Sequence, residues 1–358
     1  MCRLRNLALF GTLTLLAACA STAPQQQAAQ VNLSQDGDTY SISAPLASFS
    51  DFILVETQAG DVPPRVVDLQ SAIDDLASYD AVFIGEAHGH VASHYVQSKI
   101  FSGLYAVNPD LTLSMEQFER PAQSIVDDYL AGKIGEETLV HDGKAWPHYR
   151  SSYRPLVEFA KNNDLPVIAS EIPGNMVSCI GERGPDFLKS LDGEPRAWAA
   201  EKLHLEDGGY KDKYYAFLAA VPSHRVGGDL SETEKEKKRF YRYAAQVSRD
   251  DTMAESIAQH MKANPGRKIM HINGSFHSAG LLGTPERLAI HIPGVKMANV
   301  HPIIVDDPKN PSFDASSVGE GQYLLLIYPV PKRFVQMKNI NAFIKRTKDK
   351  IDENKCAY

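Results

Sequence analysis

The sequence predicts an α/β domain: a mostly parallel sheet with helices on both faces and an inserted helical cap. Short apolar runs bounded by turn residues alternate with stretches of helical spacing, which is typical of parallel sheets. A charge-rich segment over residues 177–247 lacks strand-like runs and interrupts this alternation. We therefore expect the sheet domain in two parts, residues 38–176 and 248–330, with the cap between them and a tail over residues 331–358.

The first 18 residues are typical of a secretory signal, which is removed from the mature protein. Their apolar run, residues 7–16, is too short for a spanning helix, which needs about 20 apolar residues. Small residues then lead to Cys19, the pattern at which bacterial lipoproteins accept a lipid. We expect anchoring to a lipid bilayer through Cys19, followed by a polar tether over residues 19–37. Lipoproteins that stay in the inner membrane usually have Asp directly after the lipidated cysteine. This chain has Ala20 there, so we expect it in the cell envelope, anchored to the outer membrane. An ordinary signal with an incidental cysteine is the alternative.

The charge balance argues against nucleic acid as a partner. The chain has 37 basic and 44 acidic residues, a formal net charge of −7, and loss of Arg3 and Arg5 with the signal makes it −9. Nucleic-acid binding depends on clustered Lys and Arg, which this balance does not favour. A basic run at residues 339–350 is most simply a solvated helix face that can lie near acidic lipid.

Two cysteines, Cys179 and Cys356, lie outside the signal and the expected lipidation site. An oxidising exterior permits a disulfide between them. Sequence separation does not determine the geometry that a disulfide requires, so their pairing stays open at this point.

Four apolar runs predict strands, and a polar group that can bind or react follows each of them. Helical spacing is found at residues 91–105, 121–131, 153–163 and 251–262, and a run at 323–328 predicts a late or edge strand. The four runs and their polar groups are 80–84 with Glu86 and His88, 111–115 with Glu116, 165–170 with Glu171, and 268–272 with His277.

These polar groups are expected to meet in one site, because parallel sheets bind ligands outside the carboxyl ends of their strands. Gly85 and Gly274 permit sharp turns just before them. Imidazole and carboxylate together suit a divalent transition metal such as Zn, Mn or Fe, or else acid–base chemistry. The alternative is that each acid only caps the helix that follows. The candidate metal ligands are Glu86, His88, Glu116, Glu171 and His277.

Five segments, in this order, resemble the ChaN-like haem-binding lipoproteins, which share a superfamily with the Tiki, TraB and GumN-like proteins. The resemblance covers about residues 66–288, with a poor match over the interior 177–247. Its most specific features are two G-x-x-H motifs with the MEQFER segment between them. The segments are GEAH at 85–88, MEQFER at 115–120, YRPLVEFA at 153–160, RDDTMA at 249–254 and GSFH at 274–277, followed by Gly280.

The resemblance implies a sheet domain with an added helical portion and an iron-related role. Some members bind haem, with tyrosine as the iron ligand and dimers that enclose stacked haems. Haem or an iron compound, and a second copy of the chain, are therefore implied partners. The Tiki branch implies a metal-dependent protease instead. The motifs carry over to Glu86 and His88 in the first, Glu116 and Arg120 in the second, and Gly274 and His277 in the last.

Two positions depart from the family pattern. Gly89 stands where the family often has Asp, which puts in doubt a contact behind the preceding histidine. Glu171 stands where relatives more often have a neutral residue, so this carboxylate is particular to the present chain.

The residues that would hold haem are sought among tyrosines and arginines. Tyr149 and Tyr153 lie four apart, and tyrosinate is an axial ligand for ferric iron. Arg154 and Arg120 offer a fork of donors that pairs with haem propionates. The alternative is that both tyrosines, with Trp146, pack a helix onto the sheet.

The cap is expected to be helical over residues 194–205, 211–220 and 231–247. Ser231 and Glu234 form an S-x-x-E capping box at the start of the last helix. The aromatic residues that are dense in the cap favour a core, and they also suit the enclosure of a flat apolar ligand.

Three functions stay open at this point. The first, which we rank first, is capture of haem or an iron compound by an anchored lipoprotein in iron uptake. The second is hydrolysis of a peptide or other polar bond by a metal-activated water, with Glu86 or Glu116 as general base. The third is a scaffold whose polar strand ends only cap helices.

Overall fold

The structure is a computed structural model that describes residues 29–57, 62–220, 230–352, 356 and 358. Cys19 and the expected signal lie outside these described residues, so the predicted lipid anchor stays a prediction. Within the described part of the chain, no helix combines the length and the apolar character needed to cross a bilayer.

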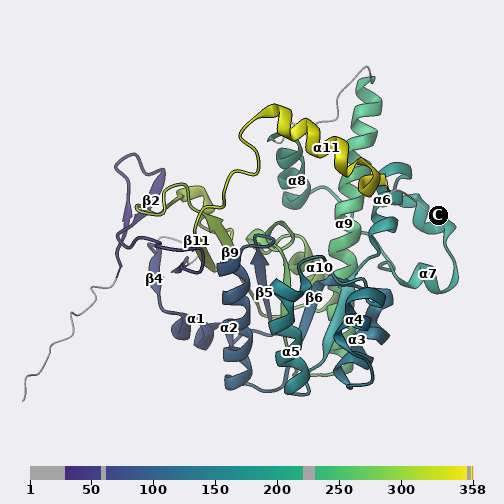
Figure 1. Ribbon diagram of the computed structural model, residues 1–358, viewed down its shortest axis with the longest axis horizontal. Helices are drawn as coiled ribbons and strands as arrows, with labels where there is room; N and C mark the ends of the chain where they lie inside the picture. Colours follow the sequence, from purple (N-terminus) through teal and green to yellow (C-terminus); the bar gives the residue numbers. More distant parts are fainter. Residues whose placement is uncertain (1–28, 58–61, 221–229, 353–355, 357) are drawn as a thin grey trace, which may run out of the picture.

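A central eight-stranded sheet organises the protein (Figure 1). Its strands are β3 (Phe52–Glu56), β4 (Arg65–Val67), β5 (Ala81–Glu86), β6 (Leu111–Glu119), β7 (Val167–Glu171), β8 (Lys268–Gly274), β9 (Met297–Ile304) and β11 (Tyr323–Ile327). They follow the order β4-β3-β11-β9-β5-β8-β6-β7. The six strands from β11 to β7 pair in parallel. β3 has the opposite direction and pairs antiparallel with both β11 and β4. The predicted mostly parallel sheet is confirmed.

Helices cover both faces of this sheet, as predicted. Val82 and Ile84 of β5 face one core, into which α1 (Leu69–Leu76), α2 (Val91–Val107) and α5 (Arg154–Asn162) pack. The alternate residues, Ala81 and Phe83, face a second core with α9 (Glu232–Ala263) and α10 (Thr284–His291). Every residue of β5 is buried, because a central parallel strand is covered on both sides. The helices α3 (Gln123–Leu130) and α4 (Glu136–Asp142) complete the first layer.

The inserted cap contains helices and no strand among its described residues. It contains α6 (Gly174–Arg183), α7 (Gly193–Ala197), α8 (Gly209–Ala220) and the first half of α9. The capping box at Ser231 is confirmed. We expected two helices, over residues 231–247 and 251–262, but α9 is one continuous helix of 32 residues. This helix links the cap to the layer that covers the sheet.

The helix predicted over residues 194–205 ends early, at Ala197. The backbone N–H groups of Ala200 and His204 donate to Thr252 and Asp251, side chains of α9, instead of continuing a helix. Tertiary hydrogen bonds therefore outweigh the local helical pattern here.

A small second sheet begins inside the segment that we predicted as tether. Its strands are β1 (Val31–Leu33), β2 (Thr39–Ile42) and β10 (Ser312–Asp314), and they pair antiparallel. Buried Ile42 and Phe313 pack against the outer side of β11, which explains why a polar segment without an apolar period becomes ordered.

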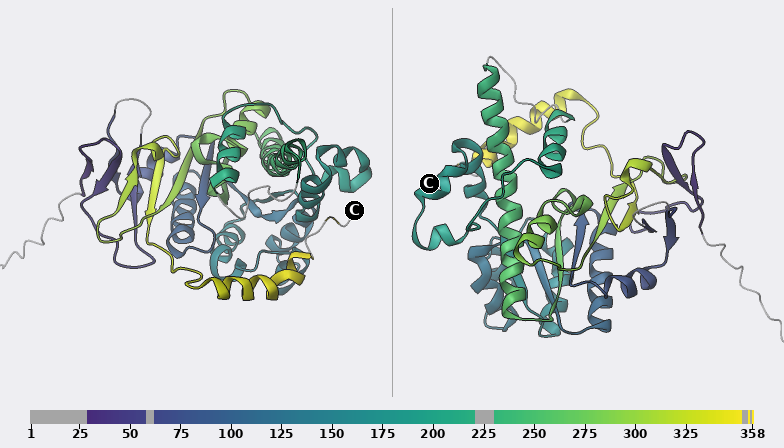
Figure 2. Two further views of the ribbon diagram at one scale, coloured as in Figure 1. Left: turned by 90° about the horizontal axis from the view of Figure 1, so that it is seen from above. Right: turned by 180° about the vertical axis from the view of Figure 1, so that it is seen from behind.

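The C-terminal segment contains α11 (Met337–Asp352) and returns to the cap, where Cys356 forms a disulfide with Cys179 of α6. This settles the pairing that the sequence left open. Figure 2 (left) shows α11 along one side of the molecule, outside the helices that cover the sheet.

Candidate functional site

The polar groups at the strand ends do meet at one edge of the sheet. The order β5-β8-β6-β7 places the carboxyl ends of four parallel strands side by side. Glu116 accepts a hydrogen bond from the backbone N–H of Gly274. A Cβ atom at Gly274 would lie 2.8 Å from Nε2 of His88, so only glycine lets the imidazole approach this backbone.

His88 is held by a buried carboxylate. Its Nδ1 lies 2.7 Å from Oε1 of Glu86, and because a carboxylate only accepts, Nδ1 carries the proton and Nε2 keeps its lone pair. Glu86 is 2% exposed and also accepts from Tyr153 and Gln97 at 2.6 and 2.7 Å. The hydrogen bond that His88 donates to Glu86 raises the pKa of His88. The His88 side chain is 50% exposed, so this fixed imidazole is open to a ligand.

Trp146 lies beside this imidazole. The two rings meet edge to face with centroids 5.2 Å apart, and Trp146 contacts Tyr153 in the same manner at 6.2 Å. An apolar, aromatic surface therefore adjoins the exposed imidazole.

Arg249 of α9 joins two strand-end carboxylates. Its Nη2 lies 2.7 Å from Glu116 and 2.6 Å from Glu171. Burial acts to raise the pKa of Glu116, but Arg249, then His277 and His88, outweigh it and lower the pKa to about 2. For Glu171, burial prevails over Arg249 and the pKa is raised. One cation thus compensates two buried acids.

His277 forms a second imidazole–carboxylate pair, with Asp250 of α9 at 2.8 Å. Both are buried, and Tyr210 and Thr284 also donate to Asp250. Burial is the largest single effect and lowers the pKa of His277, but Asp250 and Glu116 together outweigh it, so the net shift is upward. For Asp250, burial acts to raise the pKa and His277 acts to lower it, and the net shift is downward.

His277→Gln is expected to cost about 2 kcal/mol of unfolding free energy near pH 5, the size of a hydrogen bond to a charged group. Because the folded pKa of His277 is raised, its contribution is full below about pH 6.5 and disappears as pH rises through the folded pKa. Asp250, with a lowered pKa, loses its contribution as pH falls below about 3.8. Urea unfolding between pH 3 and 9 checks this window, with exposed His141→Gln as the control. A pH-independent difference would contradict the charged pair.

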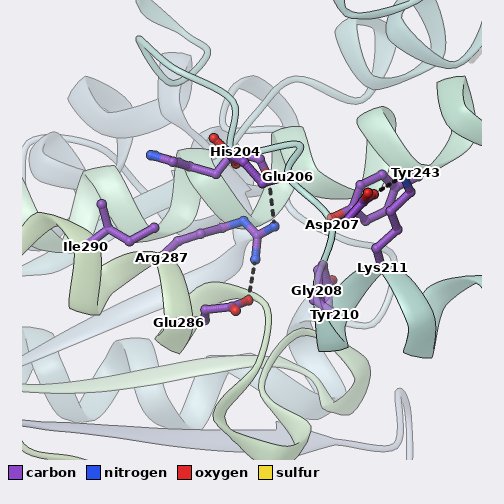
Figure 3. Close-up of a pocket in the computed structure, with 10 residues that line it drawn as sticks. All are labelled: His204, Glu206, Asp207, Gly208, Tyr210, Lys211, Tyr243, Glu286, Arg287 and Ile290. Atoms are coloured by element: carbon purple, nitrogen blue, oxygen red, sulfur yellow. Dashed lines mark hydrogen bonds and ion pairs between the residues drawn. The ribbon is translucent and has the colours of Figure 1, made fainter.

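Tyr210 also lines a pocket of about 180 Å³ (Figure 3). Arg287 crosses it and pairs with Glu286 and Asp251 at 3.2 and 3.3 Å, and His204 pairs with Asp251 at 2.8 Å. Its lining has Lys211 and Arg287 against three acids, so its charge does not favour an anionic ligand.

The helix-capping alternative is wrong for the strand-end acids. The N-cap of α2 is His90, whose Nδ1 accepts from the backbone of Ala92. α6 begins after Pro173 without a side-chain cap. Glu86, Glu116 and Glu171 instead hold side chains of other elements.

The five predicted metal ligands are brought to this edge. There Glu86 binds His88, Arg249 binds both Glu116 and Glu171, and Asp250 binds His277. Among the residues that the structure describes, no group of three or more His, Cys, Asp or Glu side chains is arranged to hold a metal ion. The Zn, Mn or Fe site stays a prediction without structural support.

Of the four predicted haem residues, Tyr153 adjoins the exposed imidazole through Trp146 and Glu86, whereas the contacts of Tyr149, Arg154 and Arg120 lie elsewhere. Tyr149 and Tyr153 are buried in the first core, and burial raises the pKa of both phenols, which disfavours tyrosinate. Arg154 pairs with Glu136, and Arg120 fastens the end of β6 to α9 through Ser256 at 2.8 Å. The burial of the two tyrosines matches the alternative in which they pack a helix onto the sheet. Their role as iron ligands stays a prediction.

Arg249 and Asp250 have roles that the sequence did not predict, although they belong to the segment 249–254 that carries the family resemblance. The signal was a run of three charged residues, 249–251, among Ala, Met and Ile within a helical pattern. Asp250 and Asp251 are fully buried in the helix, and buried charges require partners of opposite sign.

Comparison with known proteins supports the resemblance. A family model described as haem-binding uptake, Tiki superfamily, ChaN, matches residues 72–288. The solved structure of ChaN of Campylobacter jejuni, described by its cofacial haem binding, is 16% identical with a TM-score of 0.54, over 80% of this chain and 100% of that one.

Two other solved structures are more distant. An erythromycin esterase in its open conformation is 14% identical (TM-score 0.42; 82% of this chain, 86% of that one). A Bacillus cereus protein is 12% identical (TM-score 0.40; 79% and 97%). At 16% identity the likeness to ChaN of Campylobacter jejuni concerns the fold alone. No curated protein matches the chain.

Proposed function

We propose that this chain, which belongs to the ChaN family of haem-binding uptake proteins in the Tiki superfamily, binds ferric haem through His88. The observation that carries the proposal is the half-exposed imidazole whose Nδ1 is held by buried Glu86. Histidines that bind metals almost always donate their other N–H to such a partner, which orients the ring and raises its basicity. Imidazole is also an established axial ligand of haem iron.

The residues around His88 fit a flat, apolar macrocycle. Trp146 adjoins the imidazole. An aromatic cluster at the base of the cap is linked to His277 through Asp250, which accepts a hydrogen bond from Tyr210. Ligand sites combine apolar surface with a few placed polar groups, as Trp146 and His88 do here. Haem supplies the iron, and the chain supplies the imidazole, its orientation and the aromatic surface. The cluster consists of Tyr210, Tyr214, Phe217, Tyr243 and Phe276.

The biological setting is also part of the proposal. The signal pattern and Cys19 support a lipid-anchored protein of the outer membrane, and the description of the family supports a role in iron uptake. His88 would supply one ligand to the iron, which would leave room for a ligand from a second copy of the chain.

Titration of the purified mature chain with ferric haem is expected to give a shifted Soret band that saturates at one haem per chain. Emission from Trp146 is expected to fall in parallel, because an acceptor bound beside His88 lies against this indole. A Soret band that never saturates, with unchanged emission, would remove the proposal.

A further inference from the structure

We propose that the first ten residues of α11 and the six residues before it form a docking surface for an anionic lipid bilayer. This surface, residues 331–346, extends beyond the haem site and does not depend on it. Its first feature is charge. It carries five basic residues and no acidic residue, in a chain whose formal net charge is −7.

Its second feature is apolar exposure. Among the exposed large hydrophobic side chains of the described residues, the two most exposed are Val335 at 86% and Met337 at 70%. Ile344 is 53% exposed, and none of the described side chains of α11 is fully buried. Exposed apolar side chains that gather in one short segment are typical of a surface that binds another phase or protein.

The same segment is internally ordered. Phe334 packs against Phe343 with ring centroids 5.3 Å apart, and Arg333 lies over both rings. The aromatic contact folds the preceding residues onto the helix, so the basic and apolar side chains are presented together.

The position of α11 allows it to reach a flat surface. It lies outside the sheet-covering helices in Figure 2, and it runs from the end of β11 towards the cap in Figure 1. The disulfide between Cys356 and Cys179 fastens the chain again beyond the helix. Both ends are therefore attached, and the surface is held at one side of the molecule.

An anionic bilayer is the occupant that matches both features. Amphipathic helices with basic flanks lie in the headgroup region with their apolar face buried. Each Lys or Arg near an anionic surface raises affinity about fivefold, and salt weakens the effect. A second copy of this chain would bring two positive surfaces together, which charge repulsion disfavours.

The test uses the full mature chain with Cys19→Ser, so that no attached lipid contributes. It is mixed with vesicles of phosphatidylglycerol and phosphatidylcholine in equal parts, or of phosphatidylcholine alone, and bound protein is measured by flotation. We expect binding to the anionic vesicles only, weakened by salt. The triple variant Lys338→Glu, Lys345→Glu, Arg346→Glu is expected to bind about 100-fold more weakly.

The matched control changes the net charge equally at exposed lysines elsewhere: Lys133→Glu, Lys189→Glu, Lys202→Glu. It is expected to retain most of the binding, and Val335→Ser with Met337→Ser is expected to lose it. Equal loss in both triple variants, or no binding by the parent chain, would overturn the proposal. The proposal would also be overturned if the chain formed a dimer without vesicles and only the triple variant in α11 dissociated it. Haem titration of each variant shows that folding and the haem site are intact.

Discussion

His88→Ala is expected to lower the affinity for ferric haem by about 100-fold or more and to change the Soret position of any remaining complex. Loss of groups that only support a metal ligand costs about 10–100-fold, and the ligand itself contributes at least as much. The variant should remain folded, because the His88 side chain is 50% exposed. Absorbance titration with ferric haem, beside a circular dichroism melt, gives both quantities.

The matched control for this prediction is His141→Ala, which removes another exposed histidine, on α4. It should bind haem as the parent does, which excludes unspecific binding to surface imidazole. The affinity of the parent for haem should also decrease as the pH drops below the raised pKa of His88, because a protonated Nε2 has no lone pair for iron. Unchanged affinity in His88→Ala would assign the iron to another residue.

Arg249→Met is expected to cost about 3–5 kcal/mol of unfolding free energy, the cost of removing one partner from a buried ion pair. Methionine retains much of the volume but leaves Glu116 and Glu171 buried without their shared cation. Urea unfolding at pH 7 measures the loss.

A control in the same helix is Arg239→Met, which removes an exposed arginine paired with Glu236. Exposed pairs contribute less than about 1 kcal/mol. In the parent, Glu116 has its pKa lowered to about 2, so its contribution is present above about pH 4.5 and is lost as pH falls through 2. In Arg249→Met the carboxylates are desolvated without compensation, so their folded pKa values rise and the defect should grow as pH increases from 4 to 7. A loss below about 1 kcal/mol at pH 7 would show that Arg249 is dispensable.

The central strands were predictable because each is an apolar run that ends at a polar group. β5, β6, β7 and β8 are covered on both faces, so burial along the strand is visible as unbroken hydrophobicity. β9 was missed because Asn299, His301 and Pro302 interrupt its apolar pattern. Asn299 donates to Ser278 and Glu320, partners that lie far from it in the chain.

The acids and imidazoles of the site were predictable from their position after the strands, but their partners were not. The charged residues at 249–251 divided the α9 pattern into two predicted helices. In the fold each charge is compensated by a residue far along the chain: Arg249 by Glu171, Asp250 by His277 and Asp251 by His204. Local spacing contains no information about such pairs, so the continuity of the helix and the role of Arg249 required the structure.

The most direct measurement is an iron anomalous difference map from crystals of the haem complex. The account predicts an iron peak within coordination distance of Nε2 of His88, with the macrocycle beside Trp146. An iron peak in another part of the molecule, with the His88 imidazole unligated, would contradict it.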